Sequence, residues 1–145
     1  MAEHRTRFVG TYEFRLDDKG RMVLPAKMRA QLGETGIMSK NGPCLGLWTL
    51  EGFDAAGDQL EARLETGEVT LDALRQFAAD AHEVTPDQQG RIVIPQRLRA
   101  YARLGSEVVV TGVRKRIEIW DKQIWDAQSD SRDAQLLDAV QVVRL

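Results

Sequence analysis

The sequence predicts an α/β protein with a mainly β core, built from two β-hairpin and helix modules that lean on each other, with further helices outside. The stretch DDKGRMVLPAKMR, from Asp17 to Arg29, returns seventy residues later as DQQGRIVIPQRLR, from Asp87 to Arg99. Each copy is followed by apolar strand-like segments and then by helical sequence. A chain of 145 residues holds two such units only if they share a core, because a domain of about 70 residues is marginal alone.

The first copy begins with a strand in which Tyr12, Phe14 and Leu16 alternate with charged residues, the period of a half-buried strand. DDKG is a turn signal, and RMVL after it is typical of a returning strand. Pro25 opens the next helix and Gly33 ends it, because proline suits the first helical position and glycine follows the last. GIMS and CLGLWTL, on either side of KNGP, predict a second hairpin.

The second copy repeats this order. It reads HEVT, the DQQG turn, RIVI, a helix that Pro95 opens and that ends before Gly105, then EVVVT and RIEIW. Trp48 and Trp120 hold matching positions directly after an apolar strand, so we expect them to pack between hairpin and helix rather than to stack on nucleic-acid bases. The repeat therefore covers a whole module.

Helical sequence follows each module. Apolar residues at helical spacing fill residues 53–81 with an interruption near Gly67, and a further helix is expected over residues 124–143 with Ser131 as its candidate N-cap. We predict four segments: a first module at 8–54, an acidic helical connector at 55–81, a second module at 82–126 and a C-terminal helical tail at 127–145.

Charge is segregated along the chain, although the net formal charge is only -2. Residues 1–50 carry eight Lys/Arg and five Asp/Glu, residues 51–86 carry two and nine, and residues 87–145 carry ten and eight. An acidic connector thus separates two locally basic modules. No apolar run has the length of a membrane span, and MAEHRTR lacks the apolar stretch of a signal peptide, so we expect a cytoplasmic protein without membrane contact.

The Asp-x-x-Gly-Arg turn is suited to holding an arginine. Its glycine, Gly20 or Gly90, permits the positive φ of a tight turn. Its aspartate can accept hydrogen bonds from the amides ahead and can hold the guanidinium four residues later by a charge-assisted bond. A fixed arginine suits phosphate contact or bidentate recognition of guanine. The pairs are Asp17 with Arg21 and Asp87 with Arg91.

A structural role is the alternative, because an exposed Asp/Arg pair generally contributes only about 0 to 1 kcal/mol. Two copies, each flanked by further basic residues, favour DNA binding. The weaker candidates for phosphate contact are Arg15, Lys19, Arg29, Arg97 and Arg99. The sequence assigns no role to the basic run at residues 114–116.

The segments LDDKGRMVLPAKMRAQL and DQQGRIVIPQRLRAYARL, with RIEIWDKQIWD behind the second, closely resemble the MraZ family of bacterial transcription regulators, whose halves belong to the AbrB-like swapped-hairpin group. The resemblance covers residues 8 to about 126. It implies that the two modules interlock into one pseudo-twofold swapped-hairpin barrel. It also implies DNA binding through both turns, a ring-like homo-oligomer, and G-rich direct repeats ahead of the division and cell-wall gene cluster as the target, hence a place on the nucleoid. Two features depart from it: Gln89 stands where the first turn has Lys19, and the tail after Ser129 lies beyond the resemblance.

Enzymatic alternatives are weaker. Asp17 and Asp87 lie in no Asp-Thr-Gly or Asp-Ser-Gly signature of an aspartic-protease dyad, and each nearby arginine favours the ionised carboxylate. Cys44 with His4 or His82 has no local signature of a nucleophile and its base, and these residues have no metal-ligand spacing. We therefore expect no catalysis, cofactor or metal. The remaining alternatives are a nonspecific architectural DNA-binding protein, an assembly protein and an antitoxin-like module that binds DNA and wraps a partner. Antitoxins of the AbrB-like group generally carry one module and a disordered tail, whereas this chain has two modules. Duplex-binding measurements would separate the architectural and assembly proteins from a regulator.

Overall fold

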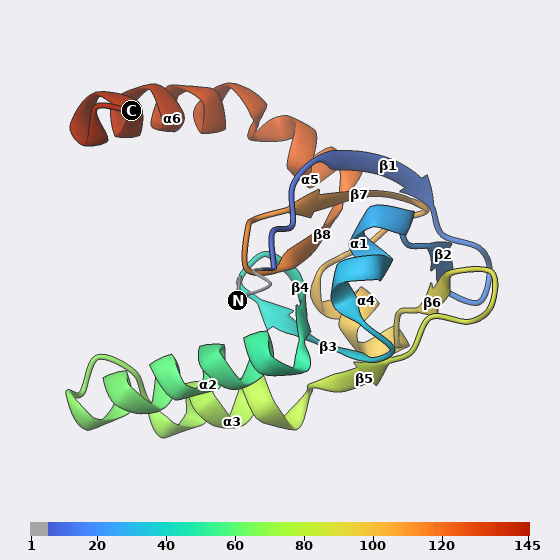
Figure 1. The fold of residues 1–145 in the computed structure, drawn as a ribbon, viewed down its shortest axis with the longest axis horizontal. Coiled ribbons are helices and arrows are strands. Elements are labelled where there is room, and N and C mark those ends of the chain that lie inside the picture. Colours follow the sequence, from blue (N-terminus) through green and yellow to red (C-terminus); the bar gives the residue numbers. More distant parts are fainter. Residues whose placement is uncertain (1–5) are drawn as a thin grey trace, which may run out of the picture.

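The computed structural model of the chain describes residues 6–145, so His4 and most of the N-terminal segment considered above lie outside the described part. Pairs of strands are followed by one or two helices along it, in the same pattern in both halves (Figure 1). Their order is β1 (Thr11–Arg15), β2 (Arg21–Val23), α1 (Ala26–Leu32), β3 (Gly36–Asn41), β4 (Cys44–Thr49), α2 (Leu50–Glu65), α3 (Leu71–Ala79), β5 (His82–Val84), β6 (Arg91–Val93), α4 (Gln96–Tyr101), β7 (Glu107–Gly112), β8 (Ile117–Asp121), α5 (Lys122–Ala127) and α6 (Ser129–Val143).

The two modules exchange strands. Six strands form one antiparallel sheet in the order β1-β7-β8-β4-β3-β5, and β2 pairs with β6 in a separate two-stranded ribbon. If each strand is replaced by its counterpart in the other repeat, the same order is obtained in reverse. The strand order is therefore pseudo-twofold, and the modules interlock, in a mixed α/β fold with a mainly antiparallel β core.

One detail of the prediction is not confirmed, and another is wrong. Among residues 6–145, β1 and β5 are the outer strands of an open sheet, so the sheet does not close into a barrel. The expected pairing of the two strands around each Asp-x-x-Gly-Arg turn is also wrong, because β1 pairs with β7 of the other module and β2 pairs with β6. The ladder from Thr11 opposite Thr111 to Arg15 opposite Glu107 covers all five residues of β1. Pairing with β2, which has only three residues, would cover less of β1.

Other local predictions are confirmed. The β3–β4 hairpin turns between Asn41 and Cys44, and α1 and α4 begin directly after Pro25 and Pro95. These short helices, together with the strands, bury one core that both repeats share. Its side chains include Leu24, Met28, Met38, Leu45, Ile92, Ile94, Leu98, Val108, Val110, Ile117 and Ile119.

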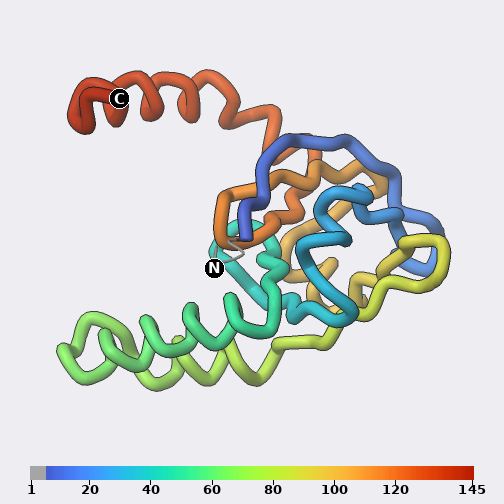
Figure 2. Tube along the Cα trace, in the orientation of Figure 1, coloured from blue at the N-terminus to red at the C-terminus, as the bar shows by residue number. Residues whose placement is uncertain are grey.

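Longer helices extend from the sheet on the side away from the ribbon (Figures 1 and 2). The acidic connector forms the antiparallel pair α2 and α3, whose N-termini are capped by the side chains of Thr49 and Thr70. After the short α5, α6 begins at Ser129, so Ser131 is not its N-cap. Within residues 6–145, no helix has both the length and the apolar character needed to cross a bilayer.

The tryptophans attach these helices to the sheet. Trp48 at the end of β4 packs edge-on against Phe53 and Phe77, with ring centroids 5.9 and 5.4 Å apart. Trp120 at the end of β8 packs in the same way against Trp125, at 5.7 Å. Trp48 and Trp120 are also almost fully buried. The prediction that these rings pack between hairpin and helix is therefore confirmed.

Candidate nucleic-acid interface

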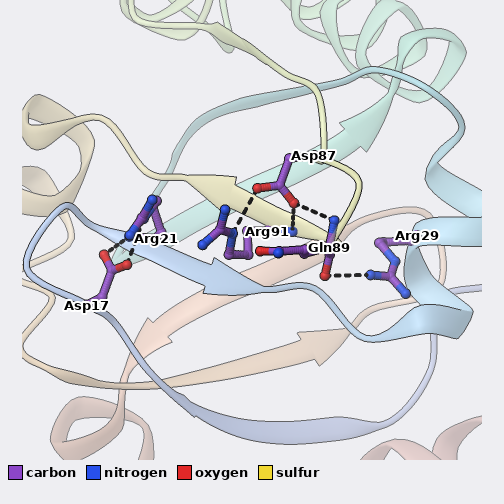
Figure 3. Close-up of polar contacts among 6 residues, drawn as sticks. All are labelled: Asp17, Arg21, Arg29, Asp87, Gln89 and Arg91. Carbon is purple, nitrogen blue, oxygen red and sulfur yellow. Dashed lines mark hydrogen bonds and ion pairs between the residues drawn. The ribbon is translucent and has the colours of Figure 1, made fainter.

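In the first turn, Asp17 binds both the backbone and the arginine. Its Oδ1 accepts a hydrogen bond from the amide of Lys19 at 2.9 Å. Oδ1 also accepts one from the amide of Arg21 at 2.8 Å, and Oδ2 accepts one from Arg21 Nε at 2.7 Å (Figure 3). The turn is closed by Gly20 N, which donates to Asp17 O at 3.0 Å. One carboxylate thus fixes the turn and the direction of the guanidinium together.

The second turn has the same geometry. Asp87 Oδ1 accepts from the amides of Gln89 and Arg91, each at 2.9 Å, and Oδ2 accepts from Arg91 Nε at 2.8 Å. Replacing Lys19 by Gln89 leaves these bonds in place because they use the backbone amide at that position. The two turns therefore hold their arginines alike.

Electrostatics and hydrogen bonding keep these aspartates ionised. The amide of Arg21 and its side chain lower the pKa of Asp17, and those of Arg91 lower the pKa of Asp87. Each carboxylate occupies Nε of its arginine, while both Nη groups have no hydrogen-bond partner among the described residues. The outer fork of each guanidinium is therefore available to a ligand.

The ribbon presents both arginines on one face. Met22 and Ile92 lie opposite each other in its centre and are buried, so their neighbours along each strand face outward. The side chains of Arg21 and Arg91 are 31% and 37% exposed. Two oriented guanidinium groups thus lie on one side of a two-stranded ribbon.

Each turn is also contacted by an arginine from the helix of the other module. Arg29 of α1 reaches the second turn, where its Nη1 donates to Gln89 O at 3.5 Å beside Gly90 (Figure 3). Arg99 of α4 lies across Gly20, and its Nε is buried without a hydrogen-bond partner within the described residues. These two predicted phosphate contacts therefore pack against the turns.

The backbone conformation and close packing at positions 20 and 90 both favour glycine. Gly20 and Gly90 have φ of +74° and +79°, and both are buried beneath the arginine from the other module. Their carbonyls accept hydrogen bonds from Ile94 N and Leu24 N, each at 2.9 Å and each from the other module. The backbone of one turn is thereby tied to the strand of the other.

The remaining basic candidates lie in different settings. Lys19 is exposed at the tip of the first turn. Arg15 at the end of β1 forms an exposed ion pair with Glu107 of β7 at 3.2 Å. The run at residues 114–116 lies in the β7–β8 loop and lines a hollow of about 390 Å³ at the start of α2, so it does not belong to the ribbon.

Arg97 has a carboxylate partner that sequence reasoning missed. Asp80, at the C-terminal end of α3, pairs with Arg97 of α4 and with Lys40 of β3, the latter at 2.7 Å. Its side chain is only 5% exposed. No repeat could reveal this cluster, because Gly10 stands at the matching position of the first module. Asp80 also ends the acidic connector, where scattered acidic residues are typical of a solvated helix face.

The groups considered for catalysis have structural surroundings. Cys44 is buried, and burial raises the pKa of its thiol to about 12, so the thiolate that a nucleophile needs is disfavoured. Asp17 and Asp87 each have a lowered pKa, whereas a dyad that shares a proton has one raised pKa. Within residues 6–145, no group of three His, Cys, Asp or Glu residues is placed to hold a metal ion.

Comparison with known proteins agrees with the doubled geometry. The family described as "MraZ protein, putative antitoxin-like" matches twice, over residues 7–73 and 77–141. The transcriptional regulator MraZ of Salinispora tropica is 40% identical over 137 residues, which is 92% of this chain and 96% of the relative. That of Parafrankia sp. is 45% identical over 121 residues, 82% and 84% of the two chains, and that of Thermobifida fusca is 40% identical over 137 residues, 92% and 96%. With two matching modules, each carrying an Asp-x-x-Gly-Arg turn, the chain belongs to the MraZ family.

Proposed function

We propose that this protein is a sequence-specific DNA-binding transcriptional regulator. The observation that carries the proposal is the β2–β6 ribbon, which presents Arg21 and Arg91 on one face with both Nη groups open to a ligand. The major groove of B-DNA admits a two-stranded ribbon, and an arginine fork matches the O6 and N7 acceptors of guanine. The family relatives are named transcriptional regulators, which supports the same reading.

In this proposal each residue class has a separate task. Arg21 and Arg91 contact guanine, and Asp17 and Asp87 hold them in the direction that the contact needs. Lys19 contacts phosphate from the tip of the first turn, and Arg15 and Arg97 add weaker phosphate contacts because carboxylates already bind them. Arg29 and Arg99 position the turns.

The target and the assembly are proposed from the family resemblance. The operator is a set of G-rich direct repeats upstream of the division and cell-wall gene cluster, and the protein acts on the nucleoid as a ring-like homo-oligomer. A single ribbon offers few phosphate contacts, and nonspecific binding to DNA typically has a Kd of about 10⁻⁴ to 10⁻⁶ M. Several copies held together would raise the effective concentration of ribbons at the DNA.

Selection of genomic DNA fragments by the purified full chain tests the proposal. We expect enrichment of fragments with a shared guanine-containing element, bound more tightly than a shuffled duplex of equal length. Salt-sensitive binding without sequence preference would instead identify an architectural DNA-binding protein. No binding to any duplex at low salt would contradict both, and would leave an assembly protein.

A further inference from the structure

The outward face of the ribbon carries apolar side chains beside its arginines. In the antiparallel register, Arg21 lies opposite Val93 and Val23 lies opposite Arg91. Because alternate residues of a strand share a face, these four side chains form one outward square with the arginines at diagonal corners. The valines take the other two corners.

Both valines are open to solvent. Val23 is 44% exposed and Val93 is 51% exposed, whereas Met22 and Ile92 on the inner face are buried. A hollow of about 230 Å³ beside the ribbon is lined by Arg21, Arg91 and Val93 together. The same ligand could therefore touch a guanidinium and an apolar side chain.

Exposure of a single valine would need no functional explanation, since valine is common in strands and isolated apolar residues are normal on surfaces. Val23 and Val93, however, are counterparts in the two modules, each two residues after a motif arginine. They occupy the surface between the two groups assigned to the DNA. A ribbon in a groove would bury them against the base edges.

We propose that Val23 and Val93 contact the C5 methyl groups of thymines close to the guanines that Arg21 and Arg91 bind. In the major groove thymine is the base with a methyl group, and small apolar side chains contact it. This inference rests on the proposed DNA-binding function and makes the reading of the site more specific. The ribbon reads a mixed element of guanine and thymine, not a run of guanine alone.

Strand geometry limits where the thymines lie. Two residues along an antiparallel strand span about 6.8 Å, from a rise of about 3.4 Å per residue. That length corresponds to about two steps along one DNA strand, at about 3.4 Å each. For a ribbon that follows the groove, each thymine is therefore within about two base pairs of a guanine contact.

Uracil substitution tests the contact without changing the protein. Each thymine of the selected operator is replaced singly by deoxyuridine, which removes only the methyl group. We expect the wild-type protein to bind about four-fold more weakly when a contacted methyl is lost, the usual worth of one buried methylene group. Substitution at thymines farther from guanine should leave the affinity unchanged.

Protein variants combined with the uracil substitutions form a double-mutant cycle. Val23→Ala and Val93→Ala should bind the thymine operator more weakly and should each lose sensitivity to uracil at one position. Val113→Ala, at an exposed valine in the β7–β8 loop, is the matched control and should respond to uracil like the wild type. A variant that failed to fold would leave the uracil measurement on the wild type decisive.

The two proposals fail in different ways. Wild-type protein that binds its operator specifically but tolerates uracil at every position would overturn the valine contact alone. An operator without thymine near its guanines would do the same. Absence of sequence-specific binding to the thymine operator would overturn the proposed function and the valine contact together.

Discussion

Arg99 of α4 lies across Gly20 in the turn of the other module, so that a Cβ on Gly20 would stand only 2.7 Å from Arg99 Cζ. Arg29 of α1 has the corresponding place against Gly90. Each helix therefore supports the turn that the opposite repeat supplies. In the proposed function, such an arginine would support DNA binding by holding the turn.

Arg29→Ala should therefore disturb the second turn, and Arg99→Ala the first. In amide NMR spectra we expect Arg29→Ala to shift the Gly90 signal more than the Gly20 signal, and Arg99→Ala to do the reverse. Both variants should bind DNA more weakly with an unchanged salt dependence. Loss of a phosphate contact would instead reduce the slope of log K against log salt by about 0.9. That result would show that Arg29 and Arg99 contact DNA phosphates directly.

Arg21→Ala and Arg91→Ala should each weaken specific binding, because a bidentate arginine contact supplies about 1 to 3 kcal/mol of discrimination. Arg21→Lys should also weaken specific binding, because lysine keeps the charge without the planar fork. Affinity for the selected operator and Tm are the measurements, and Tm should change little. Arg75→Ala, at an exposed arginine of α3 paired with Asp72, is the control. Wild-type affinity in both ribbon variants would contradict the assignment.

Asp17→Ala should weaken DNA binding although it removes a negative charge. The carboxylate accepts three hydrogen bonds that fix the turn and Arg21, so its loss frees the guanidinium. Long-range electrostatics predicts the opposite sign. Asp18→Ala is the matched control, because Asp18 has no hydrogen bond or ion pair within residues 6–145 and its removal should leave binding equal or tighter. Tighter binding by folded Asp17→Ala protein would show that Asp17 only solvates the turn.

Asp80→Asn should lower Tm at neutral pH and less so in acid. The hydrogen bond from Lys40 and the charge of Arg97 lower the pKa of Asp80 from its ordinary value of 3.8. A lowered folded-state pKa contributes stability above the unfolded value, and that stability is lost as pH falls through the folded value. Comparing Tm of the two proteins at pH 7 and pH 3 measures the difference. Asp72→Asn, at an exposed pair, should change Tm little; a constant Asp80→Asn deficit at both pH values would contradict the ionic role.

The operator should respond to the spacing of its elements. If several ribbons of one homo-oligomer bind repeated elements, the second contact gains about 10² to 10⁴ in affinity from effective concentration. Inserting about 5 bp, half a helical turn, should then weaken binding far more than mutating one element. Operators with one, two and three elements are compared alongside the protein's mass from light scattering. A monomer that binds one element as tightly as three would contradict assembly on DNA.

Much of the local structure follows from local signals. The two prolines place the starts of α1 and α4, and the apolar segments around KNGP form the β3–β4 hairpin. The pairing of β1 with β7 and of β2 with β6 joins residues far apart in the chain, and periodicity identifies a strand without naming its partner. Asp17 and Asp87 could be predicted because they hold matching positions in the two repeats. Asp80 could not, because it has no acidic counterpart in the first module.

The exchange of strands delays folding during synthesis. Thr11 of β1 pairs with Thr111 of β7, so the ladder of β1 is incomplete until about 100 further residues have been made. At about 5 to 20 residues per second, that wait is about 5 to 20 s. During the first part of that wait, until β5 is made, the first module exposes the edge of β3 that β5 later covers, and exposed strand edges invite pairing with other chains. A nascent first module thus has the surfaces to pair with another nascent first module on a neighbouring ribosome before its own second half emerges.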